Sequence, residues 1–107
     1  MPQFLYRIQP VRTDMLVQST PDEDRIVGEH FAYLKSLTKR GVVLLAGRTL
    51  NTDASSFGLV ILNVSNEEEA KGWMLGDPAV RAGVFDAEFS PYRLALVSEE
   101  LRSEAPA

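Results

Sequence analysis

The sequence predicts an α+β fold, because strand patterns and helix patterns follow one another in the order βαββαβ. Two observations lead to this prediction. A well-capped helix pattern occupies residues 21–40, and two near-continuous apolar runs rich in branched residues follow it. With right-handed crossovers, this order gives a ferredoxin-like arrangement, in which both helices cover one face of a four-stranded antiparallel sheet.

The first helix has clear start and stop signals. The Thr20 hydroxyl can accept a hydrogen bond from a backbone N–H of the first turn, and Pro21 suits the first helical position. Glu23 completes the spacing of a capping box. Gly41 follows two basic residues, as expected where a left-handed residue ends a helix.

The strands are expected where β-branched and aromatic residues are dense. The first is expected within residues 4–12, with Pro10 marking its end, and the apolar runs at 42–49 and 57–64 should form an antiparallel pair. The last is expected at 84–97. Pro91 interrupts its alternation, which favours a bulge or an edge position for this strand.

A second, shorter helix follows the third strand. Ser65 and Glu68 have capping-box spacing, and the helix should end near Gly76. A further helical turn is predicted with Asp77 as its N-cap and Gly83 as its stop.

The amino-acid composition limits the classes of function that this chain can have. The 107 residues suit one domain, and 45% hydrophobic with 24% charged residues is typical of a soluble globular protein. No apolar run is long enough to span a membrane and no secretory signal is recognised, so we expect a cytoplasmic protein. A net charge of -4 gives no electrostatic reason to bind nucleic acid or an anionic membrane, which favours small molecules or protein partners.

Residue usage limits the available chemistry. The absence of cysteine excludes thiol catalysis, and a single histidine removes the common zinc ligand sets, so we expect neither a metal nor another cofactor. That histidine, His30, has Ile26, Val27, Tyr33 and Leu34 as its helical neighbours, so its ring should lean toward the buried stripe. From the pattern alone, it is either an inert core residue or a chemical group.

We expect one domain over residues 1–97 and a polar, largely mobile tail over 98–107. Side chains on both faces of the third strand are apolar, whereas the two helices can cover only one face of the sheet. A homodimer packed through the open sheet face is therefore expected. The alternative is that the tail folds back over this face.

Two segments together resemble a known family. "HFAYLKSLTKRGVVLLAG" and "EEEAKGWMLGDPAVRAGVF" are similar to the YciI-like (YCII-related) proteins, which pair a His-x-x-Tyr-Leu helix with a later Ala-x-x-Trp and an Asp-Pro turn. The resemblance spans about residues 3–97. It implies a ferredoxin-like fold, a dimeric α+β barrel and a proposed active site whose matching positions are His30 and Asp77. The family often has Gly-Pro after the second strand, where this chain has Gly47 and Arg48.

The resemblance implies a site, but it does not by itself choose between an enzyme and a binding protein. Family members include a dehydrochlorinase of a chlorinated hydroxyhydroquinone, although most have no established reaction. We expect His30 and Asp77 to carry out proton transfer or elimination on a small, possibly aromatic, compound, in a lyase-like or isomerase-like reaction. Arg48 either binds a substrate carboxylate or phenolate or is a solvated charge at a strand end. The alternative function is a non-catalytic ligand-binding or interaction protein on the same dimeric scaffold. Analogy with other proteins of this fold gives a third possibility, a monooxygenase or isomerase that acts on aromatic compounds.

Overall fold

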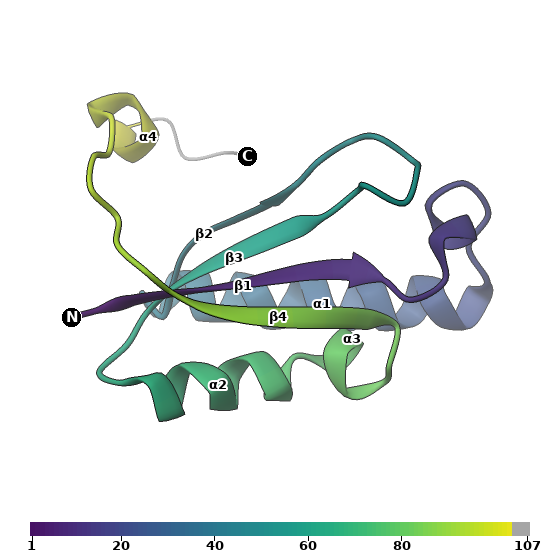
Figure 1. Ribbon diagram of the computed structural model, residues 1–107, viewed down its shortest axis with the longest axis horizontal. Coiled ribbons are helices and arrows are strands. Elements are labelled where there is room, and N and C mark those ends of the chain that lie inside the picture. Colours follow the sequence, from purple (N-terminus) through teal and green to yellow (C-terminus); the bar gives the residue numbers. More distant parts are fainter. Residues whose placement is uncertain (104–107) are drawn as a thin grey trace.

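The computed structural model describes residues 1–103, with side chains described to residue 101. Its strands and helices occur in the predicted order (Figure 1). The strands are β1 (Gln3–Pro10), β2 (Val43–Arg48), β3 (Gly58–Asn63) and β4 (Phe85–Tyr92). The helices are η1 (Thr13–Leu16, a 3₁₀ turn), α1 (Pro21–Lys39), α2 (Glu67–Gly76), α3 (Pro78–Arg81) and α4 (Glu99–Ser103).

The four strands form one antiparallel sheet in the order β2-β3-β1-β4. This confirms the ferredoxin-like α+β fold. β4 lies at an edge of the sheet, where a proline is tolerated because no further strand needs its N–H, and Pro91 pairs regularly with Phe4. The irregularity in the sheet lies elsewhere, as a register shift in β2 between Val43 and Leu45.

The core lies between the sheet and the helices. Alternate residues of β1, namely Phe4, Tyr6 and Ile8, are buried on the helix-covered face, as the two-residue period of a strand requires. The same core contains Leu34, Leu37, Val43, Val60, Leu62, Val64, Ala70 and Met74. Tyr6, at the centre of β1, is therefore held on both sides by neighbouring strands, opposite Val60 and Phe89.

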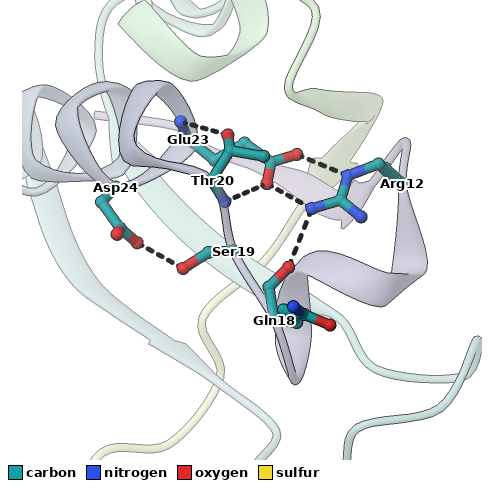
Figure 2. A network of polar contacts seen from close by, with 6 residues as sticks. All are labelled: Arg12, Gln18, Ser19, Thr20, Glu23 and Asp24. Atoms are coloured by element: carbon teal, nitrogen blue, oxygen red, sulfur yellow. Dashed lines mark hydrogen bonds and ion pairs between the residues drawn. The ribbon is translucent and has the colours of Figure 1, made fainter.

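The start of α1 confirms the predicted capping box. The Glu23 N–H donates to the Thr20 hydroxyl, and the Glu23 carboxylate accepts from the Thr20 N–H (Figure 2). Arg12, from the segment after β1, adds two hydrogen bonds of 2.6 and 2.9 Å to the same carboxylate and a third to the Gln18 carbonyl. The side chain of Arg12 thus ties the β1–α1 connection to the first turn of the helix. At the other end, Gly41 has φ +77°, as predicted for the helix stop.

Two local expectations need correction. The N-cap of α2 is Asn66, whose side chain accepts from the Glu69 N–H, one residue later than the predicted pair of Ser65 and Glu68. Asn is as good an N-cap as Ser, so a helix that starts after Asn66 is capped as well as one that starts after Ser65. The last strand ends at Tyr92 instead of continuing to residue 97, because β1 starts at Gln3 and offers no partner beyond that pair.

The tail is partly helical. Residues 99–103 form α4, which stands apart from α1 and α2 in Figure 1. Leu96 is 93% exposed, so the described part of the tail does not bury this side chain against the sheet. The expectation of a mobile tail lies, for residues 104–107, outside the described residues.

The second face of the sheet is mixed in character. Leu5 and Leu45 are cross-strand partners of Ile61, and these leucines and Leu59 are only half-buried. β4 presents polar residues on this side, beginning with Asp86 and Glu88. The apolar part of the face is therefore concentrated on β1, β3 and β2. Within the described residues, no helix has the length and apolar character needed to cross a bilayer.

Candidate active site

Asp77 occupies the junction between α2 and α3. It follows the last residue of α2 with an extended backbone, and Pro78 then begins α3 with its φ already suited to a helix. Its Oδ1 accepts a hydrogen bond of 3.0 Å from the Ala79 N–H, which confirms Asp77 as the N-cap of this turn. The side chain is fully buried. A buried carboxylate of this kind requires several hydrogen-bond donors.

His30, in the middle of α1, supplies one of these donors. Its Nδ1 lies 2.8 Å from each carboxylate oxygen of Asp77. The residue is largely buried, and its ring makes a T-shaped contact with the Phe85 ring, at an angle of 84° and with the ring centroids 5.2 Å apart. The structure therefore brings together the two residues that the sequence singles out.

Tyr6 is a third member of the site that the sequence analysis missed. Its hydroxyl donates a 2.8 Å hydrogen bond to Oδ2 of Asp77, and its side chain is fully buried. Burial raises the pKa of the Tyr6 hydroxyl far above its usual 10, and the charge and hydrogen bond of Asp77 raise it further. Tyr6 therefore stays protonated at neutral pH. The sequence does contain a signal for this role, because a tyrosine at a buried position of a strand usually needs a partner for its hydroxyl.

These contacts define which atom can do chemistry. An ionised carboxylate only accepts hydrogen bonds, so the His30 nitrogen facing Asp77 must carry a proton. In the neutral ring, Nε2 then holds the free lone pair. Among the described residues nothing hydrogen-bonds to Nε2, and 11% of the His30 side chain is exposed. The arrangement suits an imidazole that takes up or gives a proton at Nε2 while Asp77 fixes its tautomer.

Arg48 is not part of this cluster. It ends β2, the edge strand opposite to β4, and its side chain is exposed. Among the side chains that the structure describes, it makes no hydrogen bond or ion pair with His30 or Asp77. Its role in ligand binding stays a prediction.

Tyr33 and Trp73 pack against each other beside the site. The Tyr33 hydroxyl donates to the Trp73 carbonyl at 2.7 Å, and the Arg40 guanidinium lies 5.4 Å from the centre of the Trp73 ring. Burial, followed by the charge of Asp77, raises the pKa of Tyr33 to about 12. These contacts agree with a packing role for both aromatic residues.

Two open hollows on the described part of the chain both lie away from the His30–Asp77 pair. One, of about 600 Å³, is lined by residues 12–21, and the other, of about 420 Å³, lies at the start of α2. An apolar cavity beside the pair would require a second subunit in a dimeric barrel, so it stays a prediction about the assembly.

The sheet order and the helices on one face define an α+β protein with the ferredoxin-like fold found in dimeric α+β barrel proteins. The YCII-related domain model matches residues 8–89, so the chain belongs to the YCII-related family. A similar solved structure is the 5-chloro-2-hydroxyhydroquinone dehydrochlorinase TftG from Burkholderia phenoliruptrix AC1100, in complex with 2,5-dihydroxybenzoquinone. It is 21% identical with a TM-score of 0.65, and the match covers 87% of this chain and 95% of that one. No curated protein matches the chain.

Proposed function

We propose that this protein is a small-molecule enzyme in which His30 and Asp77 act as a proton-transfer pair. The observation that supports this most is the buried Asp77 carboxylate, which faces Nδ1 of His30 at 2.8 Å and leaves Nε2 free. With no partner for Nε2 among the described residues and 11% of the side chain exposed, this nitrogen is available to a substrate. In this proposal His30 is the general base and Asp77 holds its tautomer and stabilises the imidazolium that forms.

The proposed reaction is an elimination or a related proton abstraction on a small, possibly aromatic, hydroxylated compound. In a dehydrochlorination, Nε2 takes a proton from the substrate, the freed electron pair forms a new double bond, and the C–Cl bond breaks as chloride leaves with its electron pair. The net change is loss of HCl, so the step needs no external oxidant or reductant. The family membership and the likeness to TftG motivate this substrate class, and no cofactor is invoked.

The proposed enzyme is a homodimer that packs through the open sheet face. Half-buried Leu5, Leu45 and Leu59 support this assembly, because a second sheet would remove them from water. The dimer would supply the cavity beside the pair. Arg48, exposed at the sheet edge, is then available to a ligand carboxylate or phenolate.

The test compares His30→Gln with Lys35→Gln, an exposed position on the same helix. Gln can still hydrogen-bond to Asp77 but takes up no proton at neutral pH. With 5-chloro-2-hydroxyhydroquinone as substrate, we expect chloride release to fall by roughly 10²–10⁴-fold in His30→Gln only. Unchanged release in His30→Gln would exclude the base role.

A binding measurement accompanies the turnover assay. Because the chain has a single histidine, its ring ¹⁵N signals in an NMR spectrum belong to His30 without ambiguity. We expect 2,5-dihydroxybenzoquinone to shift these signals. Such a shift without any chloride release by the wild type would support the non-catalytic ligand-binding alternative instead, and neither shift nor release would contradict this substrate class.

A further inference from the structure

We propose that Tyr6 is a positioning residue of this site, whose hydroxyl holds the Asp77 carboxylate so that His30 keeps one tautomer and one ring orientation. The catalytic importance of this role rests on the proposed function above. The effect of Tyr6 on the tautomer and orientation of the His30 ring does not rest on the proposed function, because that effect exists without any substrate.

The first argument is the number of donors on the carboxylate. Oδ1 of Asp77 accepts from the Ala79 N–H, Oδ2 accepts from the Tyr6 hydroxyl, and Nδ1 of His30 approaches both oxygens equally at 2.8 Å. Each oxygen of the carboxylate therefore has a hydrogen-bond donor besides His30. Rotation of the Asp77 side chain would break at least one of the flanking hydrogen bonds of a carboxylate that solvent does not reach.

The second argument is the rigidity of the support. Tyr6 lies in the middle of β1, which pairs on both sides within the sheet, and the ring is fully buried. A hydroxyl on this ring therefore has little freedom to move. Supporting groups of this kind orient a catalytic side chain through hydrogen bonds made on its far side.

The third argument concerns charge. Tyr6 remains a neutral donor at neutral pH, so it shares the negative charge of Asp77 without adding any charge of its own. Removing the hydroxyl leaves more of that charge to His30 and favours the imidazolium. The other groups around the ring do not substitute for Tyr6: β4 contributes uncharged Phe85, and the Tyr33 hydroxyl is engaged by the Trp73 carbonyl.

The alternative is that Tyr6 is only a core residue whose hydroxyl needed some acceptor. Tyr6→Phe separates the two roles, because it removes one oxygen and keeps the ring. Tyr33→Phe is the matched control, since it also removes a tyrosine hydroxyl, here a partly buried one that bonds to the Trp73 carbonyl and not to Asp77.

The experiment follows the His30 ring ¹⁵N signals by NMR as a function of pH. In the wild type we expect one neutral tautomer with the proton on Nδ1. In Tyr6→Phe we expect a mixture of tautomers and a ring protonation midpoint at least about half a pH unit higher, whereas Tyr33→Phe keeps the wild-type midpoint. Wild-type signals in Tyr6→Phe would reduce Tyr6 to a packing residue.

Two further readouts keep the proposal testable. If Tyr6→Phe does not fold, the wild-type spectrum still tests the proposal. A proton on Nε2, or a mixture of two tautomers, would overturn the proposed positioning. If chloride release is available as an assay, its pH profile in Tyr6→Phe should move with the ring midpoint. Failure of the enzymatic proposal in His30→Gln would leave the NMR prediction intact, so the two hypotheses can fail separately.

Discussion

Nδ1 of His30 lies 2.8 Å from both carboxylate oxygens of Asp77, a residue 47 positions further along the chain. The same carboxylate caps α3 through the Ala79 N–H. Packing of α1, the start of α3 and the orientation of the imidazole therefore all depend on one buried side chain. A change at Asp77 must affect stability and the site together.

Replacing Asp77 by Asn tests this dependence. Asn can still accept one hydrogen bond, but it presents an N–H₂ group where Tyr6 and His30 both donate. We expect a loss of about 3 kcal/mol in the free energy of unfolding, as for a buried pair that loses one partner. Urea denaturation measures it, and Asp86→Asn on exposed β4 is the control. A loss below about 1 kcal/mol would contradict the coupling.

The loss of protein stability at acid pH should depend on Glu23. Hydrogen bonds from Arg12, and then from the Thr20 backbone, lower the pKa of Glu23 from its usual 4.5 to about 2 (Figure 2). Because the folded pKa is the lower one, this group stabilises the fold above about pH 4.5, and the contribution is lost as the pH falls from 4.5 toward 2.

Glu23→Gln isolates the charge, since Gln preserves the capping box. We expect a lower thermal midpoint at pH 7 and a smaller further decrease between pH 4.5 and 2 than in the wild type. Glu29→Gln, which disrupts only an exposed pair with Arg25, serves as the control. Parallel curves for the wild type and Glu23→Gln would show that the Arg12 contact contributes nothing.

Two glycines of α2 should respond to alanine in opposite directions. A Cβ at Gly76 would lie 2.9 Å from the Tyr33 hydroxyl oxygen, and this hydroxyl is held by the Trp73 carbonyl. Gly76→Ala should therefore destabilise the protein by about 1 kcal/mol or more. Gly72 has no atom within 4 Å of its Cβ position, so Gly72→Ala should stabilise the helix by about 0.5–1 kcal/mol. Urea denaturation of both variants checks the difference in sign.

Local signals made most of the fold predictable. The capping box at Thr20, the glycine stops at Gly41 and Gly83 and the cap at Asp77 lie where the sequence pattern places them, because caps and stops depend on nearby residues. The end of β4 was not predictable in this way. It is determined by where β1 begins, which is a property of pairing between distant segments.

The site was predictable only in part, for the same reason. Resemblance to a family singled out His30 and Asp77, whereas no sequence spacing relates Tyr6 to either of them. Their contact depends on β1 lying beneath the α2–α3 junction, which exists only after folding. A search for buried tyrosines without a local acceptor would have found Tyr6, because its alternation with Phe4 and Ile8 already marks the covered face.

The open face of the sheet leads to the last prediction, on assembly. Leu59 lies on this face, between Arg7 of β1 and Gly47 of β2 in the register, and is half-buried in the single chain. If two sheets pack against each other, Leu59→Glu places two buried charges at the interface, which is strongly unfavourable. We expect light scattering to show a dimer for the wild type and a folded monomer for Leu59→Glu. Leu50→Glu, at an 81% exposed leucine outside the strands, should remain dimeric. A wild-type monomer at micromolar concentration, or a Leu59→Glu dimer, would mean that the chain does not associate through this face.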